Sequence, residues 1–317
     1  MKNILLLTLA TAFFCSSASA ITYYADIEIG DPKEHKYSQL KWVDAGREPA
    51  NPLRGVPGKS DTVYAKENTT IILDKDTSFK VLELNGKNNF EVHGVRLDID
   101  KLNACMAQFD YGSSTTFAAK KGATVNIKHF TATGRGMLSN IIFGYSSIDI
   151  HDSVVNIHNV VEFICGTSDS FITNSAEKGG IAFNLRGSGK LNIKGPIILD
   201  PIVETASSKM EMLFYFREDG GNIPEITLNS PASNIYNTRI RVRLSQNAKP
   251  GKYPLVTFTP KGKQITGNFT PLSVNNRNTT MDSEIEVLGK RVKIYMGVSP
   301  TDKDKETKND LILEILK

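Results

Sequence analysis

The feature that most constrains the fold is a short strand pattern that recurs along the chain. Residues 125–127, 155–157 and 191–193 each read aliphatic-Asn-Ile, and turn-like residues precede each segment. Alternation of apolar and polar residues places the aliphatic side chains on one face of a strand. A single unit cannot bury that face, so stacked units would share one buried column. We expect the isoleucines inside a solenoid, with the asparagines outside, where they could form a ladder.

Alternation with a period of two dominates the remaining sequence, and long helical patterns are nearly absent. Residues 101–109 and 205–216 are ambiguous, since either stretch could hold a short helix. The pattern predicts an all-β protein, a right-handed parallel β-helix with N- and C-terminal caps. An antiparallel β-sandwich is the alternative, because short alternating strands recur in that architecture too.

Composition narrows the functional classes. Of the 317 residues, 40% are hydrophobic and 23% are charged, which excludes a disordered chain. Lys and Arg number 38 against 34 Asp and Glu, a net charge of +4. That excess is too small and too dispersed to indicate nucleic-acid binding.

The first 20 residues have the layout of a secretory signal peptide. Lys2 precedes an apolar core over residues 4–14, and Ala18-Ser19-Ala20 forms a small-residue cleavage site. The core is shorter than the roughly 20 residues that a membrane-spanning helix needs. We expect cleavage after Ala20 and export to the periplasm, the cell surface or the medium. Lipidation at Cys15 is left open.

The mature chain divides by composition and by the needs of a solenoid. A solenoid exposes backbone groups and apolar core at each end, so it requires caps. We expect an N-terminal cap over residues 21–60, a β-helix body over 61–240 and C-terminal strands or a cap over 241–317. Cys105 and Cys165 could form a disulfide or stay as separate buried thiols.

Both ends resemble bacterial autotransporter-like passengers, which are secreted parallel β-helices. Near the front, Trp42 is followed at 56–63 by Val-Pro-Gly-Lys-Ser-Asp-Thr-Val, although the family's second Trp is absent. Near the end, residues 251–256 read Gly-Lys-Tyr-Pro-Leu-Val and residues 309–313 read Asn-Asp-Leu-Ile-Leu. The resemblance implies the β-helix fold. Because the closing motif stands at the C-terminus, we expect a passenger without the membrane barrel.

β-Helices include polysaccharide lyases and hydrolases, which need acidic ligands for Ca²⁺ and a base, or two carboxylates across a sugar. The candidate pairs are Asp98 with Asp100, Asp74 with Asp76, and Asp149 with His151, each on one face of a strand. A solvated outer face explains each pair more simply. His158 could join the third pair at a metal, but the spacing is weak.

Exposed groups favour binding over catalysis. Tyr111, Tyr145, Tyr215 and Tyr236 could stack on sugar rings, with buried aromatic packing as the alternative for at least half of them. The strand at 239–244 places three arginines on one face, which we interpret as a solvated face, with an anion site as the alternative.

We expect a secreted structural or adhesive β-helix, without catalysis, that binds a polysaccharide or a cell-surface partner. The alternative is a polysaccharide lyase or glycoside hydrolase on the same scaffold. The sequence predicts no catalytic, cofactor-binding or metal-binding residue, no nucleic-acid partner and no integral membrane segment in the mature chain. The oligomeric state is left open.

Overall fold

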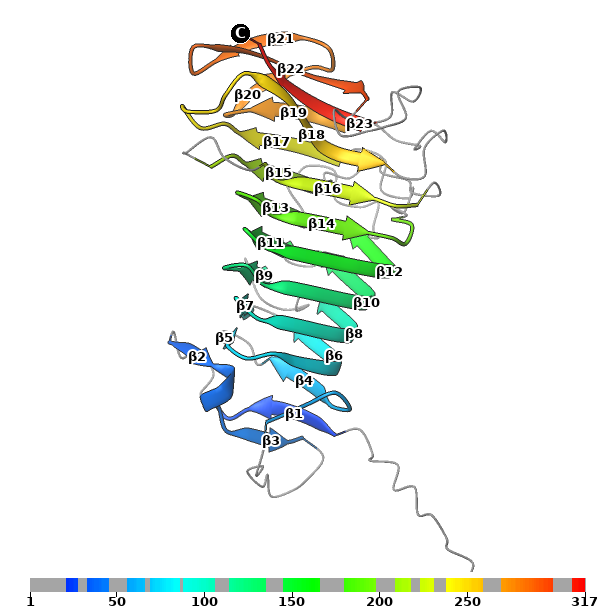
Figure 1. Ribbon diagram of the computed structural model, residues 1–317. Helices are drawn as coiled ribbons and strands as arrows, with labels where there is room; N and C mark the ends of the chain where they lie inside the picture. Colours follow the sequence, from blue (N-terminus) through cyan, green and yellow to red (C-terminus); the bar gives the residue numbers. More distant parts are fainter. Residues whose placement is uncertain are drawn as a thin grey trace, which may run out of the picture.

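The protein is an elongated stack of β-strands that form two long sheets (Figure 1). The computed structural model describes residues 21–27, 33–45, 56–65, 69–85, 88–105, 114–134, 145–165, 180–197, 209–217, 223–230, 238–258, 269–298 and 310–316. Among these residues there is one helical segment, the short 3₁₀ helix η1 (Tyr37–Gln39). No helix in the described part of the chain is long and apolar enough to cross a membrane.

Sheet A contains thirteen of the strands. Their order across the sheet is β21 (Glu284–Val287), β22 (Lys290–Gly297), β23 (Asp310–Ile315), β18 (Gly251–Phe258), β16 (Glu225–Leu228), β14 (Lys190–Ile193), β12 (Val154–Cys165), β10 (Thr124–Gly134), β8 (Arg96–Cys105), β6 (Thr77–Asn85), β4 (Thr62–Ala65), β1 (Thr22–Ala25) and β3 (Trp42–Asp44).

Sheet B contains ten strands. Their order is β2 (Glu34–Lys36), β5 (Thr70–Leu73), β7 (Asn88–His93), β9 (Ser114–Lys120), β11 (Tyr145–His151), β13 (Gly180–Arg186), β15 (Lys209–Tyr215), β17 (Thr238–Arg243), β19 (Phe269–Val274) and β20 (Arg277–Thr279). Through the body, successive strands alternate between the two sheets and each pairs in parallel with the strand of the next coil.

The register of the repeated triplets confirms the parallel β-helix. β10 and β12 pair in parallel with Ile127 opposite Ile157, and β12 and β14 continue with Ile157 opposite Ile193. All three side chains are at most 1% exposed, so they form one buried column along the axis. An antiparallel sandwich would reverse these pairings, and that alternative is wrong.

The long strands of sheet A bend in the middle. In β10, Ile127 and Phe130 are both buried, whereas Lys128 is exposed and His129 is half-buried between them. Two consecutive outward residues break the alternation, so the strand turns around the core instead of running straight. The two halves of these strands therefore form two walls around the core, and sheet B forms a third.

Aromatic rings fill the N-terminal part of the core. Tyr37 packs on Trp42 with ring centroids 5.0 Å apart, and Tyr37 also contacts Phe79 at 5.6 Å. Phe79 meets Phe90 edge to face, and Phe90 stacks on Phe117 of the next coil at 6.2 Å. These rings are fully buried, and such pairs add about 0.5–1.5 kcal/mol each beyond burial.

Tight turns lead from sheet B to sheet A, and they use the left-handed backbone region. Asp152 follows β11 with φ 48°, and Gly187 follows β13 with φ 61°. Asp152 Oδ1 accepts hydrogen bonds from the Ser188 backbone N–H at 2.9 Å and the Ser188 hydroxyl at 3.0 Å. A Cβ at position 187 would collide with the Asp152 carboxylate, and the positive φ disfavours any residue with a Cβ. Glycine is therefore required there for both reasons.

Antiparallel strands close the two ends of sheet A. At the N-terminal end β3 pairs antiparallel with β1, and Trp42 of β3 is fully buried. At the other end β23 lies between β18 and β22 and runs antiparallel to both. At both ends, sheet A therefore finishes with antiparallel pairing instead of another parallel coil.

Several expectations from the sequence can be compared with this fold. The two ambiguous stretches are strands where the structure describes them, in β8 and β15, because neighbouring coils pair with both on either side. Residues 106–109 and 205–208 lie outside the described residues, as do residues 1–20 with Cys15.

The cysteines lie on strands that do not pair with each other. Cys105 pairs with Thr133 and Cys165 pairs with Gly134, so β10 separates the two cysteines. Two strand spacings are about 9.6 Å, whereas a disulfide requires Cα atoms within about 7 Å. This register places the two cysteines farther apart than a disulfide allows, and their side chains lie outside the described residues.

Candidate binding groove on the bend of sheet A

The repeated asparagines form a hydrogen-bonded ladder on the outer face of sheet A. The Asn192 amide donates to Asn156 Oδ1 at 2.8 Å, and the Asn156 amide donates to Asn126 Oδ1 at 2.9 Å. The Asn126 amide donates to Asp98 Oδ1 at 2.7 Å, so the ladder ends on a carboxylate. The ladder therefore has a direction, because every amide donates toward the N-terminal end of the solenoid.

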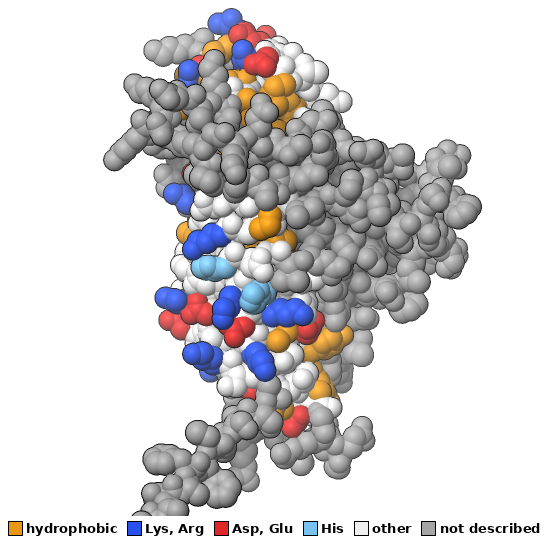
Figure 2. Space-filling view, turned by 90° about the vertical axis from the view of Figure 1, so that its right-hand side faces the viewer, with side chains coloured by type: hydrophobic (Ala, Val, Ile, Leu, Met, Phe, Trp, Pro, Cys, Tyr) orange, Lys and Arg blue, Asp and Glu red, His pale blue; other side chains and the backbone are white. Residues whose placement is uncertain are grey.

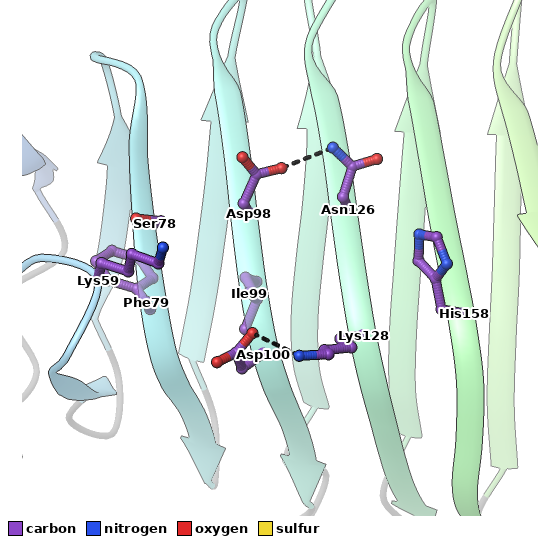
Figure 3. A pocket seen from close by; sticks show the side chains of 9 residues that line it. All are labelled: Lys59, Ser78, Phe79, Asp98, Ile99, Asp100, Asn126, Lys128 and His158. Carbon is purple, nitrogen blue, oxygen red and sulfur yellow. Dashed lines mark hydrogen bonds and ion pairs between the residues drawn. The ribbon is translucent and has the colours of Figure 1, made fainter.

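A hollow of about 340 Å³ lies beside this ladder, where the sheet begins to bend. Figure 3 shows its side chains on β6, β8, β10 and β12 together with the turn before β4. Phe79 and Ile99 belong to the buried core and lie beneath it. The remaining lining is polar and consists of Lys59, Ser78, Asp98, Asp100, Asn126, Lys128 and His158. We call this hollow the bend groove.

Hydrogen bonds hold the Asp98 carboxylate in its ionised form. Burial would raise its pKa, but the hydrogen bonds from Asn126 and Arg96 outweigh burial, and the pKa of Asp98 is lowered. Arg96 Nε lies 3.0 Å from Asp98 Oδ2. A general acid in a glycosidase needs the opposite shift, toward a raised pKa. Asp98 is therefore placed as a hydrogen-bond acceptor.

Asp100 and Lys128 form a loose pair in the lining of the groove. Asp100 Oδ1 lies 3.6 Å from Lys128 Nζ, and their side chains are 58% and 65% exposed. An exposed pair of this kind contributes little to stability, about 0–1 kcal/mol. Both groups are thus available to a ligand in the groove (Figure 3).

Outward side chains along the bend are mostly basic. Figure 2 looks at the solenoid from the right-hand side of Figure 1 and shows basic, acidic and histidine side chains mixed on its described surface. By register, one row of exposed side chains crosses five successive coils: Lys80, Asp100, Lys128, His158 and Lys194. The groove therefore offers hydrogen-bond donors and acceptors within a weakly positive surface.

Asp74 and Asp76 each accept hydrogen bonds that join neighbouring segments of the chain. Asp74 accepts from the Ser38 backbone N–H at 3.0 Å and from the Ser38 hydroxyl at 2.6 Å. Asp76 accepts from the Arg96 backbone N–H at 2.8 Å. The two carboxylates thus bind different segments of the backbone.

The proposed trio of Asp149, His151 and His158 does not meet as a metal site. Asp149 accepts from the Asn184 amide at 2.7 Å on sheet B, whereas His158 lines the bend groove on sheet A. Burial, followed by the charge of Arg186, lowers the pKa of His151. The residues that the structure describes contain no group of three or more His, Cys, Asp or Glu side chains able to hold a metal ion.

Of the four candidate tyrosines, Tyr215 is the one whose side chain the structure describes. Tyr215 is half-buried, and the Arg186 guanidinium lies over its ring at 4.5 Å from the centroid. Tyr111, Tyr236 and the Tyr145 side chain fall outside the described residues.

Sequence reasoning did not find Lys59, Lys128 or His158 as partners in one groove. The bend brings them together, and its signal was present as pairs of consecutive polar residues inside strands. Lys128-His129 and His158-Asn159 interrupt the alternation at the same step of successive coils. Such pairs mark the position at which a strand turns around the core.

Comparisons with protein-family models, with curated proteins and with solved structures find no match for this chain.

Proposed function

We propose that this protein is an exported, non-catalytic β-helix of adhesive type that binds a polysaccharide or a cell-surface glycan at the bend groove. The observation that carries the proposal is the lining of the groove, where carboxylate, amide, ammonium, imidazole and hydroxyl groups face one hollow. The groove crosses four neighbouring strands, which is about 14 Å at ~4.8 Å per strand. That length suits a short stretch of sugar rings with hydroxyls that both donate and accept.

Three further points support binding without chemistry. The lowered pKa of Asp98 opposes a role as general acid. Asp100 and Lys128 are widely exposed, so the groove lacks the dry surroundings that strengthen catalytic electrostatics. The resemblance of both ends to autotransporter-like passengers, together with the signal-peptide layout, supports export and an adhesive role.

Direct binding measurements test the proposal. The chain beginning at Ile21 would be titrated with a panel of neutral and acidic polysaccharides by calorimetry. We expect Lys128→Ala and His158→Ala each to weaken binding about tenfold, as loss of a hydrogen bond to a charged or polar ligand does. Arg291→Ala removes a similarly exposed cation on β22, away from the groove, and serves as the matched control. Equal affinity of all three variants and the wild type would refute the groove.

The enzymatic alternative is tested on the same samples. Incubation with each bound polysaccharide, followed by assays for new reducing ends and for unsaturated sugars, should show no product. Product that disappears in Asp98→Asn or Asp100→Asn would make the protein a hydrolase or lyase. Export is tested separately, because N-terminal sequencing of the mature protein should begin at Ile21, and an intact Met1 would contradict it.

A further inference from the structure

Sheet B presents a compact outward grid on β13, β15 and β17. Alternate residues of these strands are buried, for example Leu185, Phe214 and Val242, so the residues between them face outward. The parallel register aligns Arg186, Tyr215 and Arg243 in one row across three coils.

The next outward positions of the grid hold more arginine. Arg241 is aligned with Leu213, and Arg239 is aligned with Glu211. We call the set of Arg186, Glu211, Tyr215, Arg239, Arg241 and Arg243 the arginine surface.

The arginine surface carries four guanidinium groups and one carboxylate. Glu211 Oε1 lies 2.9 Å from Arg241 Nη1, and Glu211 Oε2 lies 3.8 Å from Arg239 Nη1. A single carboxylate is therefore paired with two arginines. Arg186 and Arg243 form no ion pair within the part of the chain that the structure describes. The grid therefore has an excess of three positive charges on a flat sheet, which an anionic partner would neutralise.

Three of the four arginines are held in place before any ligand arrives. Arg186 lies over the Tyr215 ring at 4.5 Å, a cation–π contact that restricts its guanidinium. The side chains of Arg239 and Arg241 are 28% and 32% exposed, so they are partly desolvated as well as paired with Glu211. Partial burial strengthens electrostatic attraction to an incoming anion, because solvent screens it less.

The spacing favours a linear polymer over a single small anion. Arg186 and Arg243 lie two coils apart, which is about 9.6 Å along the axis. An acidic polysaccharide that runs along the solenoid presents carboxylates or sulfates at comparable intervals. The guanidinium fork binds either group with two parallel hydrogen bonds, which a lysine cannot do.

We propose that the arginine surface is a second binding site, specific for an acidic polysaccharide aligned with the solenoid axis. The site lies on sheet B, whereas the bend groove lies on sheet A, so the two proposals stand or fall separately. From the sequence alone, a solvated face is the simpler interpretation of the three arginines of β17. Their alignment with Arg186 and Tyr215 now supports the anion site that was the alternative.

Calorimetric titration with heparin and polygalacturonate, at several salt concentrations, tests the site. The wild type should bind both and should bind neutral dextran far more weakly. We expect Arg186→Gln and Arg243→Gln each to weaken binding about tenfold. Each change should also reduce the magnitude of the slope of log affinity against log salt by about one. The variant makes one ionic contact fewer, so binding releases fewer counterions. Arg291→Gln on β22 is the matched control and should leave both quantities unchanged.

Glu211→Gln gives a test of opposite sign. It removes the one carboxylate of the surface, so affinity for heparin should rise severalfold, which a damaged fold could not produce. Arg243→Lys keeps the charge and loses the fork, and it should weaken binding less than Arg243→Gln. The proposal is overturned if the arginine variants bind like the wild type, if Glu211→Gln weakens binding, or if single-stranded DNA binds more tightly than either polysaccharide.

Discussion

Replacing Asn156 by alanine tests whether the asparagine ladder stabilises the solenoid. Asn156 occupies the middle of the ladder, where it donates to Asn126 at 2.9 Å and accepts from Asn192 at 2.8 Å. The substitution removes both hydrogen bonds and leaves one acceptor and one donor on the neighbouring coils. Each bond contributes about 0.5–1.5 kcal/mol, so the free energy of unfolding should fall by about 1–3 kcal/mol.

Urea unfolding followed by circular dichroism measures this loss. Thr124→Ala is the control, since Thr124 is an exposed outward residue at the start of β10 and its loss should cost within about 0.5 kcal/mol. A double-mutant cycle with Asn126→Ala isolates the pair, and we expect the two changes to be non-additive by about 0.5–1.5 kcal/mol. A loss at Asn156 no larger than at Thr124, or a strictly additive cycle, would refute a stabilising ladder.

Three more predictions follow from the described contacts. Ile157→Ala should lower the free energy of unfolding by about 2–5 kcal/mol, because Ile157 is fully buried between coils, and a loss in urea below about 1 kcal/mol would mean that the column is loosely packed. At Glu91, burial raises the carboxyl pKa, but hydrogen bonds led by that of Lys120 at 2.6 Å outweigh it and lower the pKa below its ordinary value of 4.5. Ionised Glu91 therefore stabilises the fold fully at pH values above its ordinary pKa, and this stabilisation is lost as the pH falls through the folded-state pKa. Glu91→Gln should make the free energy of unfolding fall less steeply as the pH is lowered. An unchanged fall at acid pH would contradict this. Cys105 and Cys165 should both react with a thiol reagent in unfolded, unreduced protein, and failure of either to react would contradict the separation by β10.

The recurrence of one triplet at intervals of a few tens of residues predicted the parallel coils, whereas period-two alternation alone left the antiparallel sandwich open. Val125, Val155 and Leu191 open segments with the same inward and outward order, and the parallel register keeps identical positions in one column. The prediction succeeded because each coil repeats the chemistry of its neighbour.

The groove could not be predicted in the same way, because it depends on geometry that alternation does not encode. Lys59 reaches the groove from a turn before β4, and His158 comes from β12, which lies three strands from β6. Their proximity follows from the bend and the register, and a single segment shows the bend, as consecutive polar residues, but not the register. The arginine surface has the same origin, since the alignment of Arg186 with Arg243 depends on the intervening Tyr215 strand.

The position of β23 has a consequence for the order in which the molecule can be completed. β23 is the last of the described strands along the chain, yet it lies between β18 and β22 and covers the edge of β18. Because synthesis proceeds from the N-terminus, every parallel coil can assemble while that edge still exposes its unpaired backbone groups. Asp310 is the first residue of β23, and its carboxylate accepts a hydrogen bond from the Phe258 backbone N–H at 2.9 Å. This bond to the end of β18 therefore forms only when β23 pairs. A growing chain is therefore open to pairing with other chains at the edge of β18 until β23 is in place.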